Sequence, residues 1–193
     1  MVLSLVSKKG GVGKSTSVLA FASTWLEEGH KVCIVDFDPD ATLYKLSQKT
    51  DLNLPVLAGN LTDVKGQIEK LKKEYPHIVC DTAPEGEQIM RLSGVSDEVI
   101  TPLSPSGFDL DRLQETIKIV EEVEAMRGTP LLSILITKYR SGVNRSDTLI
   151  EVLKQQELPV LDNRVRLLDR YADYGRITYT DEYRAILKEL EIL

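Results

Sequence analysis

The stretch Lys8-Lys9-Gly10-Gly11-Val12-Gly13-Lys14-Ser15-Thr16 decides how the rest of the chain is interpreted. An apolar segment at residues 2–6 leads into it, and a segment that is compatible with a helix begins at residue 18. A strand, a glycine-rich turn and a helix in this order form a phosphate-binding loop, because backbone N–H groups and the helix N-terminus together attract an anion. We therefore expect Lys14 to reach the β- and γ-phosphates of a nucleotide, and the Ser15 hydroxyl to bind Mg²⁺.

The loop departs from the general pattern G-x-x-x-x-G-K-[ST] at its first position, where this chain has Lys8 instead of glycine. Lys9, directly before Gly10, adds a further cation. The alternative interpretation is a glycine-rich turn flanked by solvated lysines. Lysines around three glycines at a strand–helix junction have little structural purpose, so phosphate binding is the favoured interpretation.

The chain has 193 residues, enough for one domain with a substantial core, and we expect a single domain over residues 1–193. Hydrophobic residues make up 42% and charged residues 28%, which is ordinary for a globular protein. The net charge of −6 excludes a polycation, so nucleic-acid binding would need a local basic patch. Neither a signal peptide nor a bilayer-spanning apolar run is visible, so we expect a cytoplasmic protein.

The cysteines and histidines do not form a pattern that is typical of a metal site. Cys33 and Cys80 each lie inside an apolar run, which indicates buried thiols in a reducing compartment. A metal or iron–sulfur site would need clustered ligands. His30 and His77 each precede a strand-like run, and we interpret both as residues that lead into strands.

Apolar strand-like runs alternate with helical runs along the whole chain. We expect strands at residues 2–7, 31–36, 55–57, 77–81, 98–102, 130–137 and 158–161, and helices at residues 15–28, 41–48, 61–73, 87–92, 109–126, 146–156, 164–173 and 180–191. This alternation predicts an α/β fold with a doubly wound, mostly parallel sheet and helices on both faces. In such sheets, ligands bind at the carboxyl ends of the strands.

Two expected strands end in aspartate at that edge. The apolar strand before Asp81 has the form of a Walker B element, whose acid holds Mg²⁺. Asp36 and Asp38 follow the second strand and, being two residues apart on an extended segment, face the same side. Both can therefore address one metal–phosphate centre. The alternatives are that Asp81 caps the next turn and that Asp38-Pro39 forms a plain turn.

The loop resembles the deviant Walker A loop of the ParA/MinD family of ATPases, whose mark is a second lysine directly before the Gly-Gly pair. The Asp-x-Asp-Pro segment at residues 36–39 resembles that family as well, and so do residues 161–166. Residues 97–106 look like the strand and turn that, in partition ATPases, precede a long helix at the dimer interface. Asp40 is a departure, because partition members usually have glutamine there. The resemblance covers nearly the whole chain and implies a P-loop NTPase fold.

The resemblance implies a role for each matching residue. ATP would bind the loop residues Lys9, Gly10, Gly11, Val12, Gly13, Lys14, Ser15 and Thr16. Mg²⁺ would be held by Ser15 and Asp81, with Asp36 in the magnesium shell or in the hydrogen-bond network of the loop. Lys9 would cross a homodimer interface to the nucleotide of the partner subunit, and Asp38 would position the attacking water. Lys9, Lys14 and Mg²⁺ would stabilise the transition state.

The implied function is an ATPase with slow intrinsic turnover that dimerises with ATP and partitions or positions DNA or other cargo. The ATP-bound dimer would bind DNA without sequence preference on the nucleoid, and a ParB-like activator protein would release it by stimulating hydrolysis. Candidate DNA contacts are the basic residues Lys138, Arg140, Arg145, Arg164, Arg166 and Arg170. The alternative is that each is ordinary solvated charge.

Three other functions stay open. A MinD-like membrane-cycling regulator would need a basic amphipathic C-terminal helix, but residues 180–193 carry more acid than base, so no stable membrane association is expected. A metabolic enzyme on the same scaffold, such as an ATP-dependent synthetase, would need a small-molecule acceptor, and the cysteines disfavour an iron–sulfur reductase. A nucleotide-binding module without catalysis fits less well with Asp38 and both lysines.

Overall fold

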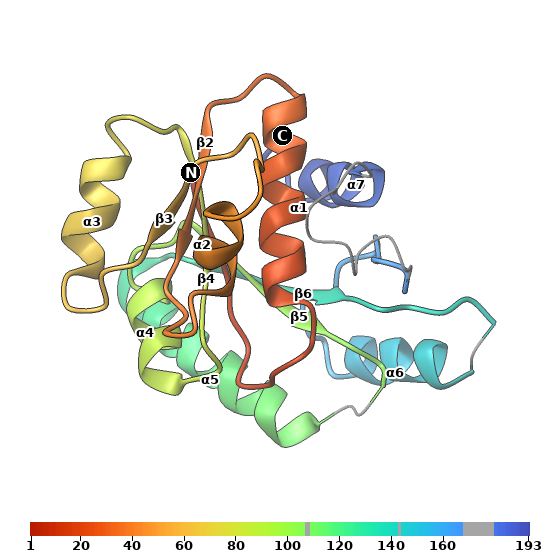
Figure 1. The fold of residues 1–193 in the computed structure, drawn as a ribbon. Coiled ribbons are helices and arrows are strands. Elements are labelled where there is room, and N and C mark those ends of the chain that lie inside the picture. Colours follow the sequence, from red (N-terminus) through yellow and green to blue (C-terminus); the bar gives the residue numbers. More distant parts are fainter. Residues whose placement is uncertain (107–108, 143, 168–179) are drawn as a thin grey trace.

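The computed structural model describes residues 1–106, 109–142, 144–167 and 180–193. Within these ranges, one sheet of six strands contains β1 (Val2–Leu5), β2 (Val32–Asp36), β3 (Val56–Ala58), β4 (His77–Asp81), β5 (Glu98–Leu103) and β6 (Leu131–Ile136). The helices are α1 (Lys14–Glu27), α2 (Thr42–Ser47), α3 (Val64–Leu71), α4 (Gly86–Ser93), α5 (Leu110–Arg127), α6 (Asn144–Gln155) and α7 (Asp181–Glu189). Figure 1 shows helices on both sides of the sheet.

The sheet is parallel at every strand pairing of the described residues, in the order β3-β2-β4-β1-β5-β6. Every residue of β1 and β2 is buried, as expected for strands that are covered on both faces. The predicted doubly wound α/β fold is thereby confirmed.

Each face of the sheet has its own set of helices. On one face, α1, Leu43 of α2 and Tyr183 of α7 pack with the strand residues Leu3 and Leu5. On the other face, α3 and α4 cover β2 and β4, while α5 and α6 cover β5 and β6. Burial of these apolar faces is the main force that holds the helices on the sheet.

Two expected elements near the C-terminal end were wrong. The strand expected at 158–161 is reduced to a single bridge between Ile134 and Val160. The helix expected at 164–173 is not helical over 164–167, where the Val165 N–H donates to the Ile136 carbonyl at 2.9 Å. Residues 168–173 lie outside the described residues. The backbone at 164–167 pairs with the chain at and beyond the end of edge strand β6, and this pairing overrides the local helical pattern.

The remaining element boundaries agree with expectation to within about three residues. The largest shift is at α3, which begins at Val64 because Asp63 caps it by accepting from the Gly66 N–H at 2.9 Å.

Cys33 and Cys80 are free and buried, as predicted. His77 is the first residue of β4, and its ring stacks on Trp25. Burial lowers the pKa of His77 to about 4, so its ring is neutral at pH 7. None of the described helices is long and apolar enough to cross a membrane.

Candidate nucleotide site

The register of the sheet brings the loop and the acidic residues to one edge. Asp81 at the end of β4 lies beside Leu5 of β1 on one side and beside Asp36 of β2 on the other. The Thr82 hydroxyl donates to the Leu5 carbonyl at 3.1 Å, which ties the two strand ends together. The predicted convergence of the three strand ends is therefore present.

Glycine shapes the loop at two positions. Gly11 has φ 72° and Gly13 has φ 94°, which are left-handed conformations that residues with a Cβ rarely adopt. Gly13 is the residue that precedes α1, and its carbonyl accepts from the Ser17 N–H at 2.9 Å. The helix thus begins inside the loop and directs its N-terminal N–H groups toward it, which is the geometry of a phosphate socket.

Two side chains that directly follow β6 donate hydrogen bonds to carbonyls of the loop. The Thr137 hydroxyl donates to the Val12 carbonyl at 2.7 Å, and the Lys138 ammonium donates to the Gly11 carbonyl at 2.6 Å. Sequence reasoning missed this support, because residues more than 120 positions away along the chain supply it.

Lys14 is a buried cation in the centre of the site. Its side chain belongs to a residue that is only 8% exposed, and its ammonium lies 3.4 Å from the Lys9 carbonyl. Burial lowers the pKa of Lys14, while the nearby carboxylates of Asp81 and Asp38 raise it. A desolvated ammonium gains more from an anionic ligand than a solvated one does, so Lys14 fits a phosphate group.

Asp81 and Ser15 lie together, as a magnesium site requires. Asp81 is buried, accepts from the Thr82 N–H at 3.0 Å and is hydrogen-bonded by the Ser15 hydroxyl. Burial, together with the neighbouring Asp36, raises the pKa of Asp81 to about 7, although the Ser15 hydrogen bond and the Lys14 charge oppose the increase. Among the described residues no group of three or more His, Cys, Asp or Glu side chains could hold a metal. The pair fits Mg²⁺, which takes one or two protein oxygens and completes its shell with water and phosphate.

Asp36 organises the segment after β2. Its two carboxylate oxygens accept from the Asp38 N–H at 3.1 Å and from the Tyr44 N–H at 3.0 Å. Burial raises its pKa, and these hydrogen bonds oppose that increase. Asp36 therefore fixes the backbone that presents Asp38, and its place in a magnesium shell stays a prediction.

Asp38 is half-buried, accepts from the Asp40 N–H at 2.9 Å and lies close enough to raise the pKa of Lys14. Its role in positioning the attacking water stays a prediction.

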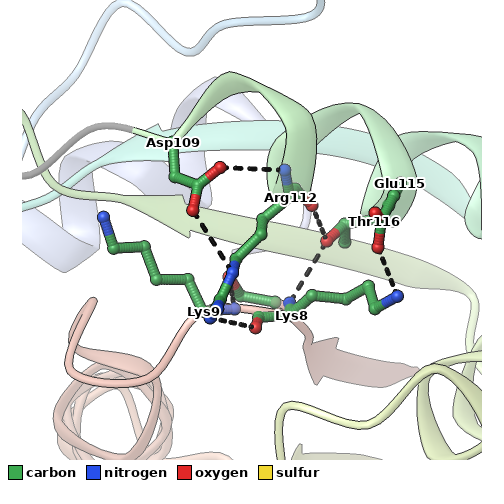
Figure 2. Close-up of polar contacts among 7 residues, drawn as sticks. Lys8, Lys9, Asp109, Arg112, Glu115 and Thr116 are labelled. Atoms are coloured by element: carbon green, nitrogen blue, oxygen red, sulfur yellow. Dashed lines mark hydrogen bonds and ion pairs between the residues drawn. The ribbon is translucent and has the colours of Figure 1, made fainter.

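Lys8 and Lys9 differ sharply in their contacts, as Figure 2 shows. The Lys8 ammonium pairs with Glu115 of α5. Lys9 is half-buried, and its N–H donates to the Ser7 hydroxyl at 3.2 Å. Its ammonium forms no ion pair with any residue that the structure describes. The predicted trans-acting lysine is thus the one without an ion pair among the residues that the structure describes.

The six candidate DNA-contacting residues do not share one setting. Lys138 contacts the loop, Arg140 is exposed, Arg164 lies 3.7 Å from Asp147, and Arg166 pairs with Glu182. The Arg145 side chain and all of Arg170 lie outside the described residues. Their contact with DNA stays a prediction.

Comparison with known proteins identifies a family of nucleotide-binding domains. Residues 3–175 match the family described as CbiA, the CobQ/CobB/MinD/ParA nucleotide binding domain. The chain is similar to the chromosome-partitioning ATPase Soj of Treponema pallidum, with 28% identity over 79% of this chain and 76% of that protein. It is also similar to the sporulation initiation inhibitor protein Soj of Bacillus subtilis, with 22% identity over 80% of this chain and 79% of that protein.

Solved structures share the fold. A plasmid partition protein from Borrelia burgdorferi bound to AMPPNP superposes with a TM-score of 0.73 and 23% identity, covering 99% of this chain and 97% of that one. Cobyrinic acid a,c-diamide synthase from Mycobacterium smegmatis, with a bound ATP analogue and magnesium, gives 0.77 and 22% identity, covering 98% and 95%.

Proposed function

The chain belongs to the CobQ/CobB/MinD/ParA family of nucleotide-binding domains, and on this premise we propose that it is an ATPase that dimerises around ATP and Mg²⁺ to partition or position DNA or other cargo. The observation that carries the proposal is the contrast between its two loop lysines. Lys14 lies buried among carboxylates, whereas Lys9 forms no ion pair with the described residues of its own chain.

Lys14, Ser15 and Asp81 support the ATP and magnesium part of the proposal. The loop N–H groups and Lys14 bind the phosphates, while Ser15 and Asp81 hold Mg²⁺. Magnesium supplies charge neutralisation at the phosphates when it is bound. Asp38 orients the attacking water from the segment that Asp36 fixes.

Lys9 supports the dimer. In a face-to-face homodimer, each Lys9 ammonium binds phosphate oxygens of the partner subunit's nucleotide, so ATP joins the two subunits. Hydrolysis removes the γ-phosphate contacts, and the dimer then separates. Nucleotide state thereby sets a two-state assembly switch, whose slow intrinsic turnover an activator of the ParB kind accelerates.

The partition relatives suggest that the ATP-bound dimer binds DNA. At a net charge of −6, the single chain as a whole repels DNA, so binding requires local basic residues that the dimer brings together. Such binding is non-specific and falls steeply with salt.

The C-terminal helix favours this proposal over a membrane-cycling function. The apolar residues Tyr183, Ile186 and Leu187 of α7 are buried against the core. The Tyr183 hydroxyl lies 3.0 Å from that of Ser17, and Arg184 pairs with Glu27 of α1 and with Glu28, the residue that follows α1. The apolar side of α7 is therefore occupied, and a bilayer would have to displace it.

A synthetase on this scaffold is the second candidate, since the mycobacterial synthase has the same fold. Its turnover would require a small-molecule acceptor. Phosphate release from ATP and water alone, without an acceptor, would favour the partition-type function.

The deciding experiment measures DNA binding at several salt concentrations, with ATP, with ADP and without nucleotide, alongside sedimentation. We expect a dimer and salt-sensitive DNA binding with ATP only. Asp38→Ala should keep ATP binding, slow hydrolysis strongly and trap the dimer on DNA. DNA binding that ignores the nucleotide, or wild-type turnover in Asp38→Ala, would contradict the proposal.

A further inference from the structure

Helix α5 holds a single residue of the loop by three groups (Figure 2). The Lys8 N–H donates to the Thr116 hydroxyl at 3.2 Å, and the Lys8 carbonyl accepts from the Arg112 guanidinium at 3.5 Å. The Lys8 ammonium pairs with Glu115. Positions 112, 115 and 116 lie on one side of a helix, so these three contacts come from one face of α5.

The direction of each hydrogen bond is fixed. Thr116 is fully buried, and its hydroxyl donates its proton to the Arg112 carbonyl at 2.8 Å. Its oxygen is therefore left as the acceptor for the Lys8 N–H. Asp109 accepts from the Arg112 N–H and pairs with the Arg112 side chain at 3.2 Å, which orients the guanidinium.

Hydrogen bonds from α5, Ser7 and Lys14 hold the peptide groups on both sides of Lys9, while Thr116 holds the N–H of the preceding peptide, at Lys8. The peptide that joins Lys8 to Lys9 has its carbonyl held by Arg112 and its N–H held by the Ser7 hydroxyl. The carbonyl of Lys9 itself accepts from the Lys14 ammonium. Because both flanking peptide planes are held, the direction in which the Lys9 Cα–Cβ bond leaves the loop is also set.

We propose that Arg112, Glu115 and Thr116 are positioning residues that aim Lys9 at its phosphate target, so that α5 controls the trans-acting lysine. This inference rests on the proposed function for the identity of that target. It adds that the reach of Lys9 depends on a helix far away in sequence, and that a change at α5 acts on assembly through Lys9.

The first test substitutes Thr116. Thr116→Val keeps the shape and removes the acceptor, whereas Thr116→Ser keeps the hydroxyl. We expect Thr116→Val to weaken ATP-dependent dimerisation about tenfold, because it leaves the Lys8 N–H without its partner. Thr116→Ser should stay within about twofold of the wild type. Affinity of the single subunit for a fluorescent ATP analogue should change less than about twofold in both, because Lys14 and Ser15 are untouched.

A charge-matched pair separates the contact from general electrostatics. Glu115→Gln removes the ion pair with Lys8 and should weaken dimerisation about twofold, since both side chains are partly exposed. Glu121→Gln makes the same charge change on an exposed part of α5 and should have no effect. Equal effects of the two variants would overturn the proposal.

A double-mutant cycle tests whether α5 acts through Lys9. In a Lys9→Arg background, which keeps a cation and so can retain a measurable dimer, Thr116→Val should cause a smaller loss of dimerisation than in the wild type, because the side chain that it positions has changed. An undiminished loss in that background would refute the positioning role.

Hydrogen exchange of the nucleotide-free protein provides a readout that does not depend on function. Thr116→Val should raise exchange at the amides of residues 8 and 9 at least about fivefold, and Glu121→Gln should not. Unchanged exchange would disprove the positioning role even if the wild type dimerises with ATP. Raised exchange in a protein whose wild type does not dimerise would instead count against the proposed function alone.

Discussion

The two lysine-bearing ends of the phosphate loop differ in how far the single chain completes them. At the Lys14 end, the ammonium is buried, lies near Asp81 and Asp38, and points back to the Lys9 carbonyl. At the Lys9 end, the backbone is held as firmly, but the ammonium has no ion pair among the described residues. The difference teaches that the pocket of the described residues already surrounds one cation, while the other is left available for the partner subunit's nucleotide that we propose as its target.

Replacing Lys14 should have the largest effect. Lys14→Met keeps most of the aliphatic stem and removes the buried charge, so we expect nucleotide affinity to fall at least about a hundredfold, on the order of 3 kcal/mol. Titration with a fluorescent ATP analogue measures this. The free energy of unfolding of the nucleotide-free protein should not fall, because a desolvated charge is removed. Retained affinity would break the assignment of Lys14 to the pocket.

Replacing Lys9 should separate assembly from binding. We expect Lys9→Ala to bind ATP within about threefold of the wild type as a single subunit, yet to form no ATP-dependent dimer in sedimentation. The physical reason is that Lys9 contributes its charge only to the partner subunit's nucleotide. Lys8→Ala is the matched control, because it removes a neighbouring ammonium that is already paired with Glu115, and it should retain most of the dimer. An unchanged sedimentation profile in Lys9→Ala would remove the distinction between the two ends.

The pH dependence of the free energy of unfolding measures how much it costs to bury the Asp81 carboxylate at the Lys14 end. Burial raises the pKa of Asp81 to about 7 from an ordinary value of 3.8. Between these values the folded protein retains a proton that the unfolded chain has released, so this group makes stability fall as pH rises, by up to about 1.4 kcal/mol per pH unit. Asp81→Asn should flatten the fall, measured by urea unfolding at pH 5, 6 and 7 without nucleotide or magnesium.

Glu98 provides the control for that measurement. Burial raises its pKa to about 7 as well, but it lies at the opposite end of the sheet, where Ser133 donates to it at 3.1 Å. Glu98→Gln should remove the Glu98 share of the slope and leave the Asp81 share. If Asp81→Asn kept the full wild-type dependence of the free energy of unfolding on pH, the Lys14 end would not contain the buried carboxyl with a raised pKa that we assign to it.

The contrast between the two ends also shows what the sequence could predict. The glycine loop, Ser15, Asp36 and Asp81 could be placed together because strand ends in a parallel sheet align, and the register confirms that alignment. The contacts that α5 makes with Lys8 could not be predicted. Glu115 lies 107 residues away from Lys8, and in the sequence it is indistinguishable from an ordinary solvated charge on a helix. The helix expected at residues 164–167 was wrong for a similar reason. The backbone there pairs with the chain around the end of β6, which is distant in sequence, so the local pattern could not indicate it.

Replacing Lys138 should have the smallest effect, and it tests where the pocket ends. Its exposed ammonium donates to the Gly11 carbonyl, so we expect Lys138→Met to weaken nucleotide binding about twofold to threefold, as an exposed charged contact does. Arg140→Met, two residues on and also exposed, is the control and should leave nucleotide affinity unchanged. If Lys138→Met instead left nucleotide affinity intact and reduced the salt dependence of DNA binding by about one ion, its ammonium would belong to the DNA surface. The hydrogen bond between the Thr137 hydroxyl and the Val12 carbonyl would then mark the boundary of the nucleotide pocket on this side of the loop.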